Sequence, residues 1–144
     1  MTAERAPAKY LARVHIHHET DLVVARRRTR EIAAHQGLSA AEAEALATAV
    51  TEIARNIVVH AGSGEMHFGI VDQATRRGVV VTARDTGAGI PYIADAMQDG
   101  YSTRGSLGYG LPGARRLVDE FEIESTVGAG TTVTLRKWAS GDRR

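Results

Sequence analysis

The chain of 144 residues contains no cysteine, and aromatic residues make up only 5% of it. Without cysteine there is neither a disulfide framework nor a thiolate metal site, so packing must stabilise the fold. The scarcity of aromatic rings argues against a platform on which nucleic-acid bases stack. No apolar run approaches the roughly 18 residues that span a bilayer, and residues 1–10 lack the apolar core of a secretory signal. We therefore expect a cytoplasmic protein that does not enter a membrane.

Charge of one sign is also lacking, because 18 lysines and arginines face 17 aspartates and glutamates, a formal net charge of +1. This balance argues against a broad electrostatic surface for nucleic acid, so we expect no nucleic-acid partner. The length suits one domain with a substantial core. We expect that domain at residues 11–138, between flexible tails at residues 1–10 and 139–144.

Apolar periodicity and turn residues predict five strands and three long helices. The strands are expected at residues 10–19, 65–73, 78–85, 121–127 and 131–138. The helices are expected at residues 22–36, 39–61 and 111–120, with a short helical piece at 92–99. Helices that fall between runs of strands predict an α+β fold: a two-layer sandwich of a mixed, mostly antiparallel sheet with helices on one face.

The helix boundaries rest on capping signals. Asp21 is the expected N-cap of the first helix and Gly37 its stop. Ser39 and Glu42 form a capping-box pattern at the start of the second helix. Pro112 is expected in the first turn of the third, where its missing N–H is tolerated. One apolar face of the second helix follows the 3.6-residue period at Leu46, Val50, Ile53 and Ile57.

Residues 78–90, GVVVTARDTGAGI, raise the main functional question. An apolar strand leads to an aspartate and a glycine-rich turn. Residues 85–88, D-T-G-A, are the tetrapeptide of retroviral-type aspartic proteases, whereas residues 85–89, D-x-G-x-G, are the adenine-contacting turn of Bergerat-fold ATPases; a capped turn without function is the third interpretation. The long helix at 39–61 fits poorly in a nearly all-β protease, and Arg84 replaces the apolar residue usual there.

The second helix carries Glu52, Asn56 and His60, which are spaced by four and share a side distinct from its apolar face. The asparagine oxygen suits Mg²⁺, a hard cation that keeps waters and phosphates as its other ligands. The glutamate suits proton acceptance from an attacking hydroxyl. A solvated polar face is the alternative explanation.

A third motif is the glycine-rich stretch GSLGYGLPGARRL, with glycines concentrated just before and at the start of the third helix. Glycines let backbone N–H groups approach phosphates, and a helix N-terminus adds a favourable dipole. The spacing is neither that of a Walker loop nor that of a dinucleotide fingerprint. A fourth motif, Gly130-Thr131, opens the last strand.

The order of these four motifs resembles the GHKL (Bergerat-fold) superfamily over residues 11–138. Within it, TEIARNI, DGYSTRGSLGYGLPGARRLVDEF and LRKW look most like the RsbT-type switch kinases, and residues 99–121 are the most specific part. The resemblance implies a serine/threonine-protein kinase that uses ATP and Mg²⁺ to phosphorylate a STAS-domain protein in bacterial stress signalling. A downstream phosphatase or sigma-pathway regulator would complete such a switch.

The resemblance also implies an adenine site. Asp85 would accept a hydrogen bond from the adenine amino group, while Gly87 and Gly89 let the turn pass close to the base. Thr131 would join that adenine network.

For the phosphates, the resemblance implies that Asn56 holds Mg²⁺ and that Glu52 is the base. Gly108 and Gly110 would contact phosphates through their backbone amides. Arg104, in a short lid at about residues 90–104, could reach the γ-phosphate, although no motif fixes it there and a solvated position explains it equally well.

Two other functions stay open: an ATP-binding anti-sigma factor that sequesters a sigma factor, and a non-catalytic module that binds nucleotide only to set its shape. Glu52 argues against the second, because binding alone needs no base.

Two clusters near the N-terminus have simpler explanations. His15, His17 and His18 fit exposed strand positions better than metal ligands. The arginines at 26, 27, 28 and 30 fit a solvated helix face, with a docking surface for an acidic partner as the alternative.

Overall fold

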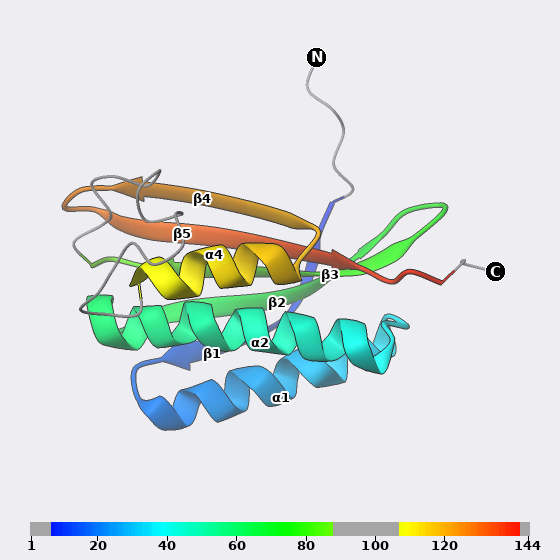
Figure 1. The fold of residues 1–144 in the computed structure, drawn as a ribbon, viewed down its shortest axis with the longest axis horizontal. Coiled ribbons are helices and arrows are strands. Elements are labelled where there is room, and N and C mark those ends of the chain that lie inside the picture. The colour runs from blue at the N-terminus through cyan, green and yellow to red at the C-terminus, as the bar shows by residue number, and fades with distance from the viewer. Residues whose placement is uncertain (1–6, 88–106, 142–144) are drawn as a thin grey trace, which may run out of the picture.

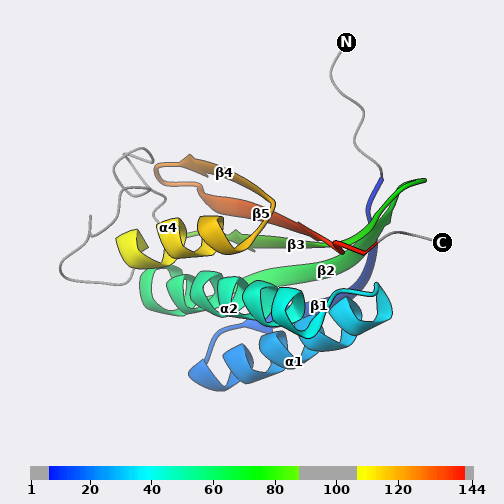
Figure 2. The ribbon, with the colours of Figure 1, turned by 45° about the vertical axis from the view of Figure 1, so that its right-hand side comes forward.

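The computed structural model describes residues 7–87 and 107–141, which form a layer of helices on a five-stranded sheet (Figures 1 and 2). The elements in chain order are β1 (Lys9–Ile16), α1 (Glu19–His35), α2 (Ala40–Asn56), the π-helical turn η1 (Ile57–Ala61), β2 (Gly64–Asp72), β3 (Arg77–Asp85), α4 (Leu107–Leu117), β4 (Glu120–Thr126) and β5 (Gly130–Trp138). Within these described residues, no helix has the length and apolar character needed to cross a bilayer.

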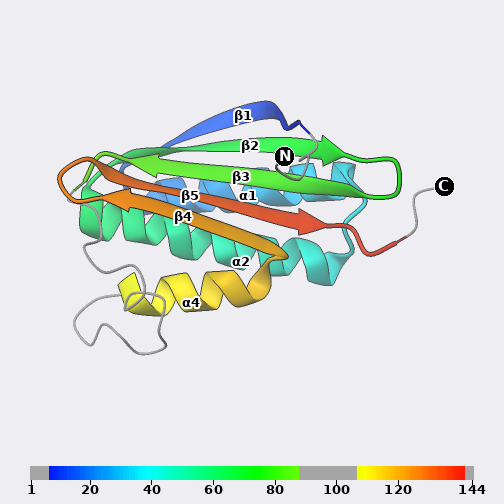
Figure 3. The same cartoon turned by 90° about the horizontal axis from the view of Figure 1, so that it is seen from above.

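The sheet has the strand order β1-β2-β3-β5-β4, and each of its four ladders is antiparallel. Helices α1, α2 and α4 all lie on one face of it, and no helix of the described residues covers the other face (Figure 3). The predicted α+β sandwich is thus confirmed. We expected a mixed, mostly antiparallel sheet, and the ladders of the described strands are all antiparallel.

The main core lies between the sheet and the helices. Alternate residues of β3 point into it, because successive strand side chains face opposite ways: Val79 and Val81 are both fully buried there. Val80 faces the other way and packs in a small outer cluster with Val71 and Trp138. The predicted apolar face of α2 is confirmed by the exposed fractions of its side chains, which are at most 3% at Leu46, Val50, Ile53 and Ile57. Burying each such side chain contributes about 1.5–3 kcal/mol to folding.

The start of α2 agrees with its capping signal, but the start of α1 does not. Ser39 Oγ accepts from the Glu42 backbone N–H, and Glu42 Oε1 accepts from the Ser39 N–H, as predicted. In α1, Asp21 is the third helical residue and not the N-cap. Its Oδ2 accepts from the backbone N–H groups of His17 and His18, both at 2.9 Å. An acidic residue there reaches back to the orphan N–H groups, so the helix begins before it.

The third helix also begins earlier than predicted, at Leu107 and not at Leu111. Pro112 therefore lies in its second turn, where its missing N–H leaves the carbonyl of Gly108 without the usual intrahelical bond.

The described part of the segment after β5 is held by hydrogen bonds. Ala139 donates its N–H to the Arg77 carbonyl at 2.8 Å, and Ser140 donates to Glu42 Oε2 at 3.0 Å.

Candidate functional site

A row of four residues crosses the sheet at one end, one on each of four strands. Gly64 pairs with Asp85, and Ser125 pairs with Thr131. Arg84 pairs with Thr132, so the next step of that ladder sets Asp85 beside Thr131. The side chains of this row face the helices, because each lies two residues beyond a member of the core row Met66, Ala83, Val133 and Ile123.

Asp85 ends β3 and shapes the turn that follows. Its Oδ1 accepts from the Gly87 backbone N–H at 2.8 Å, an Asx turn that fixes the carboxylate. The side chain is half-buried. Any Cβ at Gly87 would lie 2.7 Å from the Cβ of Ala61, so only glycine lets the turn pass this closely against the end of η1. The carboxylate is thus held at the C-terminal end of the central strand, with Oδ1 bonded within its own turn.

Gly130 brings the start of β5 against the same turn. Its φ of +111° suits glycine, and a Cβ there would collide with the Asp85 carbonyl oxygen and lie 2.8 Å from the Thr86 Cα. The two motifs D-x-G and G-T, far apart in sequence, therefore meet in space. This close approach explains why the last strand opens with glycine.

Thr131 is joined to Ser125, a residue that the motif analysis missed. The two hydroxyl oxygens lie 2.8 Å apart, and Ser125 Oγ lies 3.2 Å from the carbonyl oxygen of Gly130. Both residues are half-buried. The signal that could have found Ser125 is the register of the predicted final hairpin, which sets it opposite Thr131.

Glu52 and Asn56 lie in the last turns of α2. The C-terminal end of α2 lies at the same end of the molecule as the C-terminal end of β3, where Asp85 is the last residue (Figure 1). The Asn56 side chain is buried, with 9% exposed, so it is not part of a solvated face. Glu52 is half-buried, and its Oε2 accepts from Arg55 Nη1 at 3.1 Å. Immediately after Asn56 the α-helix becomes π-helical, and the Gly62 N–H bonds the Ile57 carbonyl at 2.8 Å.

The π-helical turn η1 carries α2 toward the Asp85 turn, since its last residue, Ala61, is the one that contacts Gly87. Single π-helical turns within helices occur frequently at functional sites. The sequence predicted a helix to this point but not the change of helix type. His60 lies on this turn, largely exposed, and partial burial lowers the pKa of its imidazole.

The remaining predicted contacts fall partly outside the described residues. Gly89, Arg104 and the lid at about residues 90–104 lie outside them. Gly108 and Gly110 belong to the first turn of α4 and not to a loop before it. Helix α4 packs beside α2, and its N-terminal end, with its unbonded N–H groups, lies at the C-terminal end of α2 (Figure 1).

The side chains of the candidate site could hold Mg²⁺ only if other ligands, such as phosphates and waters, completed its coordination. Among residues 7–87 and 107–141, no group of three or more His, Asp or Glu side chains could hold a metal. Asn56 supplies one amide oxygen, and Mg²⁺ in nucleotide sites is held by one or two protein oxygens plus phosphates and waters. The residues present therefore fit a metal that arrives with a nucleotide.

A pocket of about 220 Å³ lies near this end of the sheet, but on the other face. It is lined by His15, Ser63, Gly64, Glu65, Arg84, Asp85 and Thr86. His15, Glu65 and Arg84 are paired in register on the face without helices. Because the lining lacks Glu52, Asn56 and Thr131, we place the candidate site on the helix side of the sheet and not in this pocket.

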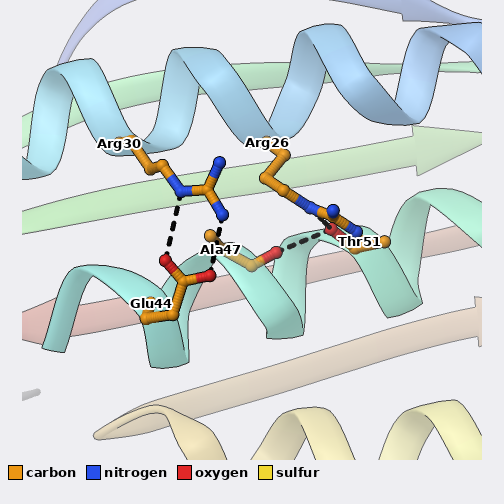
Figure 4. Close-up of polar contacts among 5 residues, drawn as sticks. All are labelled: Arg26, Arg30, Glu44, Ala47 and Thr51. Atoms are coloured by element: carbon orange, nitrogen blue, oxygen red, sulfur yellow. Dashed lines mark hydrogen bonds and ion pairs between the residues drawn. The ribbon is translucent and has the colours of Figure 1, made fainter. Parts of the chain in front are cut away.

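Two arginines of the α1 cluster, Arg26 and Arg30, form hydrogen bonds to side chains of α2 (Figure 4). Arg26 Nε donates to Thr51 Oγ1 at 3.1 Å. Arg30 binds both carboxylate oxygens of Glu44, at 2.7 and 3.1 Å. Arg27, Arg28 and Arg30 are exposed, as a solvated helix face predicts. The bonds by which Arg26 and Arg30 join α1 to α2 were not predicted.

Comparison with known proteins identifies the class. Residues 17–137 match the family described as the histidine kinase-like ATPase domain. The match spans most of the chain, and the protein belongs to this family. The resemblance to the GHKL superfamily is thereby confirmed.

Individual relatives narrow the class. The chain is 42% identical over 125 residues to the serine/threonine-protein kinase RsbT of Bacillus subtilis (strain 168). These aligned residues make up 87% of this chain and 94% of the relative. It is 38% identical over 96 residues to the anti-sigma F factor of Geobacillus stearothermophilus, covering 62% and 65%. It is 35% identical over 102 residues to that of Thermoanaerobacter sp. (strain X514), covering 67% and 70%. The likeness to RsbT-type kinases is confirmed.

Proposed function

We propose that this protein is a cytoplasmic, ATP- and Mg²⁺-dependent serine/threonine-protein kinase that phosphorylates a STAS-domain partner in a bacterial stress-signalling switch. The observation that carries the proposal is the convergence of Asp85 and Thr131 with the end of α2 that bears Glu52 and the buried Asn56. Its support from relatives is the 42% identity to RsbT over nearly the whole of both chains.

The base of ATP lies at the Asp85 end of the site. Asp85 accepts from the adenine amino group, and the Asx turn leaves its Oδ2 for that bond. Gly87 and Gly89 keep the turn free of side chains against the base, and Thr131 completes the adenine network. The phosphates extend toward α4, where the N–H groups of Gly108 and Gly110 receive them. Arg104 is proposed as a further contact to the γ-phosphate.

Transfer needs a positioned nucleophile and a proton acceptor. The hydroxyl oxygen of the partner's serine or threonine attacks the γ-phosphorus, the bond to the β,γ-bridging oxygen breaks, and ADP leaves. Glu52 takes the hydroxyl proton; its Oε2 is held by Arg55, which directs the carboxylate and leaves Oε1 for the proton. Asn56 holds Mg²⁺, which neutralises phosphate charge when bound.

An anti-sigma activity is the second candidate, and the observation that favours it is the 35–38% identity to anti-sigma F factors over about two thirds of this chain. Such a protein would share the nucleotide site and also bind a sigma factor. A pull-down with purified sigma factors and STAS-domain proteins separates the two, because the switch kinase retains only the latter.

The central experiment is incubation of the protein with labelled ATP, Mg²⁺ and purified STAS-domain proteins, followed by mapping of the modified residue. We expect label on one serine or threonine of one partner. Asn56→Ala should abolish this transfer and remove the Mg²⁺ enhancement of nucleotide binding. ATP binding with no transfer to any STAS-domain protein would favour the non-catalytic module, and an Asn56→Ala protein with unchanged Mg²⁺ dependence would place the metal on another residue.

A further inference from the structure

Two hydroxyl groups face each other at the base end of the site, on neighbouring strands. Ser125 of β4 and Thr131 of β5 are directly paired in the ladder, with Oγ and Oγ1 2.8 Å apart. The motif assignment uses Thr131 but gives Ser125 no role. Both residues are half-buried.

The two contacts of Ser125 Oγ fit one direction of donation. Each hydroxyl has one hydrogen and two lone pairs. Ser125 Oγ lies 3.2 Å from the Gly130 carbonyl oxygen, which can only accept, so the Ser125 hydrogen points there. With the Ser125 hydrogen directed at that carbonyl, Thr131 is the donor in the 2.8 Å contact to Ser125 Oγ. The hydrogen of Thr131 is thereby used, and only lone pairs remain toward the site.

Asp85 presents the same polarity from the adjacent strand. An ionised carboxylate only accepts, and its Oδ1 is already bonded to the Gly87 N–H. Asp85 and Thr131 therefore offer the base acceptors and no donor. An amino group on a purine can bond to both, whereas a carbonyl oxygen at that place meets their lone pairs.

We propose that Ser125 is a positioning residue that holds the Thr131 hydroxyl as an acceptor and so helps the site select a 6-amino purine over a 6-oxo purine. The inference rests on the proposed function, in which this end of the sheet holds adenine. Ser125 acts through Thr131 and does not itself contact the base.

Removing the Ser125 hydroxyl should change discrimination more than affinity. In Ser125→Ala, the Thr131 hydroxyl is free to rotate and can donate to a 6-oxo group. ATP and ITP differ at this position, as an amino group against a carbonyl. We expect the ratio of their dissociation constants, measured by calorimetry, to fall about three- to tenfold, the range of one neutral hydrogen bond. A merely structural role would lower the unfolding temperature without moving this ratio.

Matched variants isolate the effect. Ser125→Thr keeps a hydroxyl at a strand position and should retain the wild-type ratio. Thr132→Val removes a hydroxyl on the opposite face, beside Thr131, and should also leave the ratio unchanged. In a Thr131→Val background, Ser125→Ala should have no further effect on the ratio, because the hydroxyl through which it acts is gone.

If Ser125→Ala does not fold, Ser125→Cys gives the same test, since a thiol is similar in shape but a weak donor. Asp85→Asn, measured in parallel, separates this inference from the proposed function. If that variant binds ATP as tightly as wild type, the adenine assignment itself fails. If it binds weakly but the Ser125 variants keep a ratio within twofold of wild type, Ser125 has no positioning role and the inference is overturned.

Discussion

The two ends of the sheet use polar groups in opposite ways. At the site end, the row of Asp85, Thr131 and Ser125 keeps acceptor atoms directed away from the sheet. At the sealed end, defined by Gln36, Asp72, Arg77, Gly78 and Trp138, polar groups bond to one another (the right-hand end in Figure 1). We therefore propose that the first end binds the ligand and that the second contributes to stability.

Gln36 is the centre of the sealed end. It is fully buried, yet its amide is satisfied from both sides. Its Nε2 donates to Asp72 Oδ1 at 2.9 Å and to the Gly78 carbonyl at 3.0 Å, and its Oε1 accepts from Arg77 Nη2 at 3.0 Å. A buried amide with these bonds joins the end of α1 to the β2–β3 hairpin.

Trp138 lies at the same end, on the face of the sheet away from the helices, where it packs against Val71 and Val80. Its ring lies beneath Arg76, whose guanidinium carbon is 3.7 Å from the ring centroid. Its indole N–H donates to Glu120 Oε2 at 3.0 Å, and its backbone N–H to Asp119 Oδ2 at 2.7 Å. The only tryptophan of the chain thus joins β5 to the link between α4 and β4 and to the start of β4.

The largest effect is expected from Glu52→Gln, which keeps the shape but cannot take a proton. Transfer to the partner should fall about 10²–10⁴-fold, while ATP binding and stability stay unchanged. Single-turnover transfer from labelled ATP, with protein and partner saturating, measures it. Glu44→Gln, on the same helix but paired with Arg30, is the control and should transfer normally. A Glu52→Gln rate within threefold of wild type (about 0.65 kcal/mol) would remove Glu52 from the mechanism.

The next effect concerns nucleotide affinity at the site end. Asp85→Asn replaces an acceptor by an amide that offers a donor to the adenine amino group, and ATP affinity should fall about ten- to a hundredfold by calorimetry. Asp72→Asn, the matched change at the sealed end, should leave ATP affinity unaltered and lower stability instead. Equal loss of affinity in both variants would show that the two ends are not separate in function.

At the sealed end, Gln36→Ala should lower the free energy of unfolding by about 1–3 kcal/mol, since it leaves the Gly78 carbonyl and the Arg77 guanidinium without this partner. Denaturant unfolding measures the loss. The affinity for ATP should not change in the folded variant. Gln73→Ala, in the β2–β3 loop, is the control at about 0.5 kcal/mol. A Gln36 variant as stable as wild type would contradict the role given to this amide.

The smallest effect is the pH dependence of the α2 cap. Burial by itself would raise the pKa of Glu42, but hydrogen bonds from Ser140 and Ser39 outweigh it and hold that pKa below the ordinary 4.5. The contribution of Glu42 to stability is therefore complete above pH 4.5 and disappears as the pH falls through the lowered value. Glu42→Gln should cost up to about 1 kcal/mol at pH 7 and less at pH 3, by denaturant unfolding at each pH. A cost that grows on acidification would reverse the assignment.

Local signals predicted the elements well where the physics is local. The Ser39–Glu42 capping box, the apolar face of α2 and the final hairpin involve residues close in sequence, and the structure shows each of them. The start of α1 was wrong because Asp21 can cap from either of two helical positions. The start of α4 was wrong because Pro112 marks a first turn only when no helix precedes it.

The sequence by itself determined the class of this protein, because four short motifs and their order can be read along the chain without knowledge of any tertiary contact. It also determined that Glu52 and Asn56 lie about one turn apart on one helix, since the spacing of four is a local property. Only the tertiary structure decided that Gly130 closes on the Asp85 turn, that α2 ends in a π-helical turn after Asn56, and that Ser125 bonds Thr131. These contacts join strands and helices distant along the chain, so they depend on sheet register and packing, which no single stretch of sequence specifies.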